Sequence, residues 1–159
     1  MDESDSIMLN LKDFVIESNR IEGINRKPFK VEIDAHNTIL GLEKLTSADI
    51  EAFVNDCTGF RGTHGAVLRR TPGMNVRVGG YTPPPGGPEI EQELHKLLGD
   101  IDFGLDPYEA HCRYESLHPF TDGNGRSGRA VWLWQMGPSA LGLGFLHNFY
   151  YQTLNALKR

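Results

Sequence analysis

The chain has 159 residues, 39% of them hydrophobic and 23% charged, which is the balance of one globular domain with one sizeable core. Its formal net charge of −5 at pH 7 excludes a global positive field, so neither nucleic acid nor a membrane is expected as a partner. Its two cysteines, Cys57 and Cys112, lie at no metal-binding or redox spacing, and we expect two buried thiols in a reducing compartment.

The first residues show no secretory pattern, since Asp2, Glu3 and Asp5 stand where a signal peptide carries positive charge. No apolar run of the sequence reaches the length that spans a membrane. The sequence therefore predicts a cytoplasmic protein.

Apolar residues at helical spacing predict three helices in the first third of the chain. The first covers the N-terminal residues and ends at Gly23, a residue typical of helix C-termini. The second is expected over about Val31–Leu45. The third opens at Ser47, which is its expected N-cap.

Strand and turn signals replace the helical pattern between Gly62 and Gly87. Val76-Arg77-Val78 alternates like a strand, and the prolines at 83–85 exclude a helix. We expect a short β-hairpin and a proline-stiffened return, not a ligand for a proline-recognising module, because the proline run is short and leads into a helix. The hairpin residues are expected to offer main-chain hydrogen bonds to an extended target segment, and they are Asn75, Val76, Arg77, Val78, Gly79 and Gly80.

Helical periodicity resumes after the prolines and continues to the C-terminus. The expected helices cover Glu89–Leu98, Pro107–Leu117, Arg126–Met136 and about Leu143–Leu157. No repeat or internal linker interrupts the pattern. The sequence thus predicts a single, mainly α domain over residues 1–159 with a small β insertion.

The densest group of functional residue types lies between two of these helices. Residues 118–129 read His-Pro-Phe-Thr-Asp-Gly-Asn-Gly-Arg-Ser-Gly-Arg. His118 can take up a proton near neutral pH, and Asp122 can hold a hard divalent cation. Backbone N–H groups at the start of the next helix, together with two arginines, favour a phosphate. The residues expected to bind this anion are Gly123, Asn124, Gly125, Arg126 and Arg129.

For any one of these residues a structural explanation is available: a capped helix start with solvated arginines, anchored by Phe120 in the core. Eight specified residue types within twelve positions make that explanation a poor account of the whole run. Residues 118–129 therefore predict chemistry on a nucleotide polyphosphate.

Residues 118–129 resemble the motif of the Fic (filamentation induced by cAMP) family, H-x-F-x-[D/E]-G-N-G-R-x-x-R, at every specified position. The likeness extends over roughly residues 18–136 and implies a Fic-type helical bundle with a small β-hairpin flap at about residues 62–87. The related Doc proteins carry alanine and lysine where this chain has Gly123 and Arg126, so the resemblance favours nucleotidyl transfer over protein phosphorylation.

The resemblance implies transfer of AMP from ATP to a Ser, Thr or Tyr hydroxyl of a target protein, with self-modification as a further outcome. By analogy, His118 deprotonates the hydroxyl, and Asp122 holds Mg²⁺ or Mn²⁺ at the α- and β-phosphates. Residues 123–125 then line the anion hole, while Arg126 binds the β-phosphate and Arg129 the γ-phosphate.

A second, shorter likeness lies at residues 18–23, Ser-Asn-Arg-Ile-Glu-Gly, which resemble the family's inhibitory motif [S/T]-x-x-x-E-[G/N]. Ser18 and Glu22 are four residues apart and share one face of a helix. In the family this glutamate pairs with the second motif arginine, here Arg129, which implies an N-terminal inhibitory helix over about residues 1–23. The alternative is an ordinary helix end capped by Gly23.

Two other functions remain open beside autoinhibited adenylyl transfer. Glu22 could orient a water molecule for removal of AMP from a modified protein, as some glutamate-bearing Fic proteins are thought to do. The chain could also be a nucleotide-binding regulatory module whose chemistry is residual.

Overall fold

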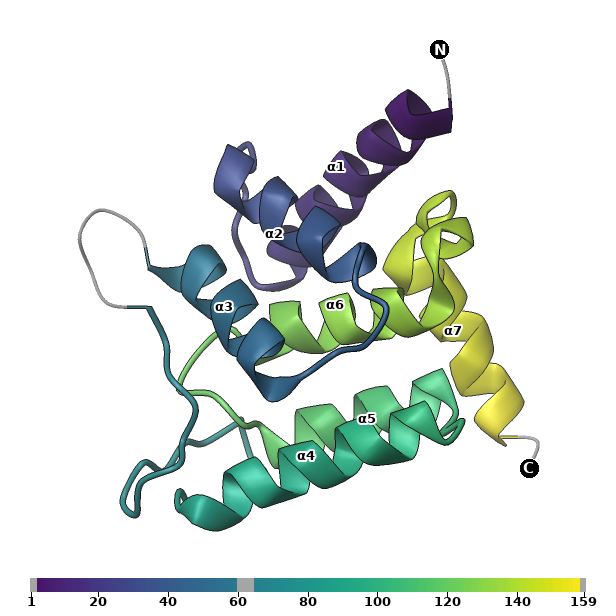
Figure 1. Cartoon of the computed structure of the whole chain (residues 1–159). Coiled ribbons are helices and arrows are strands. Elements are labelled where there is room, and N and C mark those ends of the chain that lie inside the picture. The colour runs from purple at the N-terminus through teal and green to yellow at the C-terminus, as the bar shows by residue number, and fades with distance from the viewer. Residues whose placement is uncertain (1–2, 60–64, 158–159) are drawn as a thin grey trace.

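The structure, a computed structural model, describes residues 3–59 and 65–157, with side chains from Asn10 onward. The described part folds into seven α-helices and one short 3₁₀ helix (Figure 1). In chain order the elements are α1 (Glu3–Ile21), α2 (Lys30–Leu40), α3 (Ser47–Thr58), α4 (Pro88–Asp102), α5 (Pro107–Leu117), α6 (Asn124–Met136), η1 (Pro138–Leu141) and α7 (Gly144–Leu157). None of the described helices combines the length and hydrophobicity needed to cross a lipid bilayer.

Helix α6 runs through the middle of the molecule, between α1, α2 and α3 on one side and α5 on the other (Figure 1). Almost every residue from Asn124 to Leu133 is buried. A helix buried on all sides belongs to the core. Two of its buried side chains are arginines, so neighbouring elements must supply hydrogen bonds to their charges.

Two apolar clusters pack the other helices against α6. The larger draws on α2 to α6 and includes Phe120, which confirms the predicted anchor of the motif in the core. The smaller joins α1 to α7 through Phe14, Trp132 and Phe145. The predicted inhibitory helix therefore packs on the helix that begins within the motif.

Two predicted helix ends and one predicted N-cap are wrong: α4 ends at Asp102 and not at Leu98. The second helix was expected over Val31–Leu45, but α2 ends at Leu40. The N-cap of α3 is Thr46 and not Ser47. Thr46 is the N-cap because it forms a capping box with Asp49. The hydroxyl of Thr46 accepts from the N–H of Asp49, and the N–H of Thr46 donates to the Asp49 carboxylate at 2.9 Å.

The predicted β-hairpin is wrong for residues 65–87, the part of the flap region that the structure describes, because no β-strand forms there. Val78 and Tyr81 make one isolated antiparallel bridge around a two-glycine turn. The pairing stops there because the prolines at 83–85 cannot donate ladder hydrogen bonds, and a lone two-stranded hairpin is marginally stable. Residues 62–64 of the predicted flap lie outside the described residues.

The end of α1 is a Schellman motif. The N–H of Gly23 donates to Arg20 O, and the N–H of Ile24 donates to Asn19 O, each at 2.9 Å. Gly23 has a φ of 76°, the left-handed conformation that this cap requires. Gly23 is thus the predicted cap, and the residue just before it, Glu22, is held at a fixed turn.

A buried glutamate fastens this turn to α2. Glu32 accepts hydrogen bonds from Asn19 at 3.2 Å, from Arg26 at 2.7 Å and from the N–H of Phe29 at 2.7 Å. Burial raises the pKa of Glu32, but the hydrogen bonds and the charge of Arg26 outweigh it and hold the pKa below its ordinary value. The ionised carboxylate therefore stabilises the connection between α1 and α2.

We predict that Glu32→Gln lowers the free energy of unfolding at neutral pH by about 1–3 kcal/mol, because its charge-assisted hydrogen bonds become neutral ones. The contribution of Glu32 is fully present above the ordinary carboxyl pKa of 4.5 and is lost as the pH falls through the lower folded pKa. Urea denaturation at neutral pH and at about pH 3 should therefore show a gap between wild type and variant that shrinks in acid.

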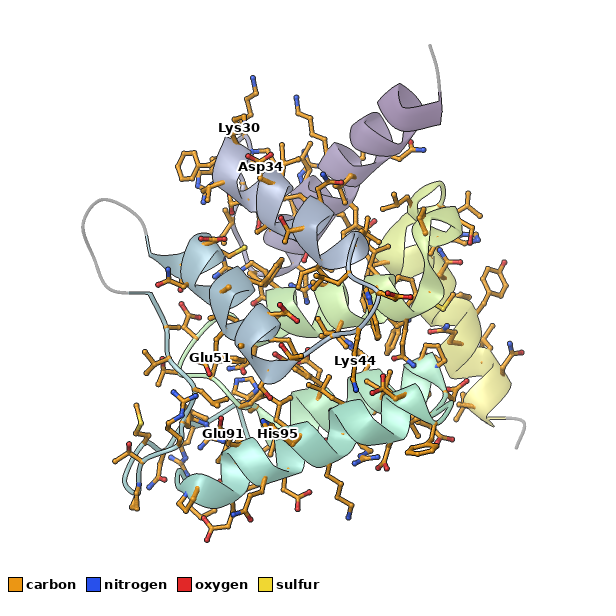
Figure 2. The ribbon with its side chains drawn as sticks, in the orientation of Figure 1. Lys30, Asp34, Lys44, Glu51, Glu91 and His95 are labelled. Carbon is orange, nitrogen blue, oxygen red and sulfur yellow. The ribbon has the colours of Figure 1, made fainter. Side chains whose placement is uncertain are left out.

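Asp34→Asn is the matched control for this experiment. Asp34 lies on the outer face of the same helix and pairs with Lys30 at 2.6 Å, where solvent screens the charge (Figure 2). Loss of this ion pair should lower the free energy of unfolding by at most about 0.5 kcal/mol. Equal losses in the two variants would contradict the structural role of Glu32.

Candidate active site

Residues 118–123 form the loop between α5 and the buried start of α6. Phe120 is fully buried, and the Asn124 side chain binds both its N–H and its C=O, at 2.8 Å each. On its other side, Phe120 forms an isolated bridge with Leu68. The loop is therefore fixed from two directions, and the side chain of Asn124, predicted to line the anion hole, holds the loop.

A cavity of about 490 Å³ opens over the N-terminus of α6. Its walls come from three parts of the chain: the motif, the end of α1 and residues 74–84, which we call the flap loop. The lining residues are Glu22, Ile24, Val76, Arg77, His118, Thr121, Asp122, Gly123, Asn124, Gly125 and Arg126. The structure thus gathers most of the predicted site residues around a space large enough for a small-molecule ligand.

His118 is half-buried and caps the end of α5 with a left-handed φ of 49°. Its Nδ1 lies 3.3 Å from Glu115 O, so Nδ1–H donates to that carbonyl and Nε2 is the basic nitrogen. Burial lowers the pKa of His118, and the charge of Arg69 lowers it further, against the opposing effects of Glu115 O, Glu22 and Asp122. A neutral imidazole that offers Nε2 can accept a proton.

Two glycines allow close approach to the backbone at the start of α6. Gly123 is the N-cap with a φ of 78°, and a Cβ there would lie 3.2 Å from Thr58 Cγ2. A Cβ at Gly125 would collide with the Glu22 carboxylate. The first N–H groups of a helix lack intrahelical acceptors and carry the positive end of its dipole, so they form a candidate anion-binding site. The Glu22 carboxylate lies directly against this site.

Arg126 is buried in the first turn of α6, and one of its N–H groups donates to Cys57 O at the end of α3, at 2.9 Å. Its Nε makes no hydrogen bond within the described residues. A buried guanidinium donor without an acceptor is costly, and a phosphate oxygen in the cavity would offset that cost.

Arg129 lies one turn further along α6, where it is buried and faces α1. Its Nε donates to Ser18 Oγ at 2.7 Å, and its Nη2 donates to Ser18 O at 3.0 Å and to Glu22 Oε1 at 2.7 Å. The structure thus joins Ser18 and Glu22, the two specified residues of the inhibitory motif, to the arginine that the resemblance pairs with Glu22. The Glu22 side chain keeps 38% of its surface exposed, on the side of the cavity.

Glu115 of α5 is an acidic group near the site that sequence reasoning missed. Its carboxylate packs against Gly128 of α6, and one oxygen makes no hydrogen bond within the described residues. Burial raises the pKa of Glu115 to about 7, while Arg129 opposes this rise and Glu22 adds to it. No motif could have signalled this residue, because its environment comes from the packing of α5 on α6.

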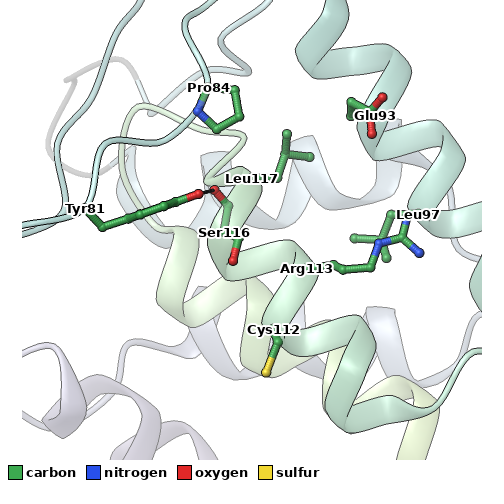
Figure 3. Close-up of a pocket in the computed structure, with 8 residues that line it drawn as sticks. All are labelled: Tyr81, Pro84, Glu93, Leu97, Cys112, Arg113, Ser116 and Leu117. Atoms are coloured by element: carbon green, nitrogen blue, oxygen red, sulfur yellow. Dashed lines mark hydrogen bonds between the residues drawn. The ribbon is translucent and has the colours of Figure 1, made fainter.

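The flap loop is anchored at both ends, which the sequence did not predict. Buried Arg69 donates to Met74 O at 3.0 Å and to Pro84 O at 2.9 Å. The hydroxyl of Tyr81 donates to Ser116 O of α5 at 2.9 Å, beside a separate cleft of about 420 Å³ that also contacts α4 (Figure 3). The base of the flap loop is therefore tied to the helix that precedes the motif.

Much of the backbone predicted to dock a target is already paired. The N–H of Asn75 donates to Gly73 O, and the N–H of Val78 donates to Tyr81 O. Val76 and Arg77 line the cavity, and their N–H groups make no hydrogen bond within the described residues. Of the residues predicted to dock a target segment through main-chain hydrogen bonds, those that line the cavity with unbonded N–H groups are therefore Val76 and Arg77.

We predict that Gly123→Ala destabilises the protein by about 1 kcal/mol from its left-handed backbone and by about 1 kcal/mol more from the contact with Thr58. Gly104→Ala is the matched control, since Gly104 has a φ of 96° and open space around it. Chemical denaturation should show the larger loss at Gly123. Equal losses would mean that the contact with Thr58 imposes no constraint.

The geometry agrees with a comparison of the sequence with known families. Residues 36–136 match the model of the Fic/DOC family. The matched span contains the flap loop, the motif and all of α3 to α6, while Ser18 and Glu22 lie outside it. This match covers more than half of the chain, which therefore belongs to the Fic/DOC family.

Proposed function

We propose that the chain is a protein adenylyltransferase, which transfers AMP from ATP to a Ser, Thr or Tyr hydroxyl of a target protein and is restrained by Glu22. Members of the Fic/DOC family are generally nucleotidyltransferases. The observation that carries the proposal is the cavity over α6, where an imidazole with a basic Nε2, a carboxylate and an anion-binding helix start face one space.

In the proposed reaction, Nε2 of His118 takes the proton of the target hydroxyl, and the hydroxyl oxygen attacks the α-phosphorus of ATP. The bond between the α-phosphorus and the oxygen bridging to the β-phosphate breaks, so pyrophosphate leaves and the target carries AMP. The N–H groups of residues 123–125 and the charge of Arg126 stabilise the negative charge on the phosphates. Catalysis then rests on positioning and on charge stabilisation.

Asp122 is the residue that would hold Mg²⁺ or Mn²⁺. It is an exposed carboxylate on the wall of the cavity. The described residues contain no cluster of three or more Asp, Glu, His or Cys side chains that could form a complete metal site. A lone carboxylate fits Mg²⁺, which commonly takes its other ligands from substrate phosphates and water. When bound, the ion would neutralise phosphate charge.

The proposed restraint is a competition for Arg129. Glu22 binds Arg129 at 2.7 Å and lies against the first turn of α6, where the γ-phosphate of ATP would have to reach the same guanidinium. While Glu22 holds Arg129, ATP binds through its other groups with its α-phosphorus out of line with the attacking hydroxyl. Removal of the Glu22 carboxylate therefore leaves Arg129 free to bind the γ-phosphate and does not open a cavity in the core.

A second activity, removal of AMP from a modified protein, is favoured by the position of Glu22 itself. Its exposed carboxylate shares the cavity with His118, so it can orient water toward a phosphate held there. Release of AMP from a previously modified target would identify this reaction. A purely regulatory nucleotide-binding module would show neither transfer nor release.

We predict that Glu22→Gly raises the rate of AMP transfer by about tenfold or more, with little change in ATP affinity. The reason is that Arg129 becomes available to the γ-phosphate. The measurement is ³²P transfer from α-labelled ATP to lysate proteins and to the chain itself, and ATP binding is followed by calorimetry. Glu22→Gln keeps the shape and removes the charge, so it should give an intermediate rate.

His118→Ala in the Glu22→Gly chain is the control for chemistry, and it should lower the rate by at least about a hundredfold while ATP still binds. Arg129→Ala should abolish the gain from Glu22→Gly, because both effects act through one guanidinium. Undiminished labelling by the His118 variant would overturn the assignment of the base. An unchanged rate in Glu22→Gly would overturn the restraint.

We predict that transfer requires Mg²⁺ or Mn²⁺ and that Asp122→Ala loses both the rate and its dependence on metal concentration, since Asp122 is the carboxylate that the loop offers. A metal titration of the Glu22→Gly chain, with and without the Asp122 change, measures this. Full activity in excess chelator is the result that would contradict the metal assignment.

A further inference from the structure

Arg69 is a fully buried cation that binds backbone carbonyls from two different parts of the site. Its Nε donates to His118 O at 2.8 Å, and its Nη2 donates to Leu117 O at 3.0 Å. Its Nη1 donates to Met74 O at 3.0 Å and to Pro84 O at 2.9 Å. One guanidinium thus bridges the end of α5, including the proposed base, and both ends of the flap loop.

The buried position of Arg69 makes this bridge resist displacement of the segments that it joins. The hydrogen bonds of the guanidinium within the described residues go to neutral carbonyls, and burial lowers the pKa of Arg69. A buried charge is costly unless every donor finds an acceptor, so displacement of either segment would leave charged N–H groups unsatisfied. The bridge therefore opposes movement of each segment relative to the other.

His118 is the residue that most needs such support. Its φ of 49° makes it the single non-glycine residue with a positive φ among the described residues. A left-handed conformation is unfavourable for a residue with a side chain, and surrounding contacts must maintain it. The C=O of His118 accepts from Arg69, which holds the peptide unit that follows this strained residue.

We infer that Arg69 is a positioning residue, which fixes the backbone of His118 and ties the flap loop to it so that the base and the docking surface keep one relative geometry. This inference rests on the proposed function, because that function is what makes His118 a base. The contacts of Arg69 do not depend on it. Arg69 does not line the cavity and acts through His118 and the flap loop.

The charge of Arg69 has a second effect on the same imidazole. It favours the neutral form of His118, while Glu22 and Asp122 favour the protonated form. The other charged groups on the walls of the cavity are Arg77 and Arg126. Removal of the Arg69 charge should therefore raise the pKa of His118, whereas a lysine at this position should preserve the low pKa.

The experiment compares Arg69→Met and Arg69→Lys, both made in the Glu22→Gly chain. Lysine keeps the charge but cannot bind four carbonyls with a planar fork, and methionine removes both properties. The readouts are turnover of α-labelled ATP to AMP on the chain or in solution, KM for ATP, the NMR titration of His118, and hydrogen exchange of the amides of Tyr81, Gly87 and Thr121.

Both variants should lose about tenfold or more in turnover with KM for ATP nearly unchanged, because small errors in geometry affect the reaction step. Only Arg69→Met should raise the pKa of His118. The amides of Tyr81 and Gly87, next to the bridge, should exchange faster in both variants. Variants that keep turnover, the His118 titration and amide protection would overturn the inference, as would a fall in turnover that leaves the titration and the exchange untouched.

Arg70→Met is the matched control. Arg70 is the next residue along the chain, but it lies at the surface and pairs with Glu51 and Glu91, which are labelled in Figure 2. This variant should leave turnover, the His118 titration and the exchange of all three amides unchanged. A response equal to that of the Arg69 variants would show that the effect is general destabilisation and would overturn the inference.

If the Arg69 variants do not fold, amide hydrogen exchange in the unsubstituted chain tests the inference. The N–H of Gly87, just past the flap loop, donates to Arg69 O, and the N–H of Thr121 in the motif donates to Val67 O. If the end of the flap loop and the motif open together, the corrected exchange rates of these two amides should agree within about tenfold. If the Gly87 amide exchanges much faster than the Thr121 amide, the inference is overturned. Absence of transfer in the Glu22→Gly chain would defeat the proposed function alone, since the His118 titration and the amide exchange still test Arg69.

Discussion

The burial of α6 places the guanidinium groups of Arg126 and Arg129 where water solvates them poorly, and neighbouring elements have to supply their partners. The end of α3 offers Cys57 O to Arg126, and α1 offers the hydroxyl and carbonyl of Ser18 to Arg129. The positions of α1 and α3 against α6 follow from these needs together with the apolar clusters. A helix with two buried arginines thus determines which surfaces surround the cavity.

The chemical nature of these partners matters as much as their number. Arg69 and Arg126 bind neutral carbonyls, which satisfy N–H groups without cancelling the positive charge. The charge of Arg69 lowers the pKa of His118, and the charge of Arg126 remains available to attract a polyphosphate. Arg129 differs because it has a carboxylate partner, Glu22. Among the cations of the site within the described residues, Arg129 is therefore the one that a side chain neutralises, and the proposed restraint acts on it.

The site is assembled from segments that are far apart in sequence, and each is fastened by a different device. A capping glycine and buried Glu32 fix the turn that carries Glu22. The side chain of Asn124 holds the motif loop, and Arg69 holds the flap loop. Because the fastening of the Glu22 turn is separate from those of the motif and flap loops, the proposed restraint requires only that the carboxylate of Glu22 leave Arg129 while the motif loop keeps its shape. This independence suits a restraint that changes rate more than binding.

The sequence by itself determined the motif at residues 118–129, the helix Pro107–Leu117 and the mainly α class, because these depend on neighbours within a few residues. The pairing of Glu22 with Arg129 could be expected only from the family resemblance, and α1 packed on α6 is what brings the two residues together. Only the tertiary structure decided that the flap loop forms no strand and that Arg69 bridges it to His118. Backbone carbonyls accept those hydrogen bonds, and a carbonyl is the same in every residue, so no sequence pattern could announce them.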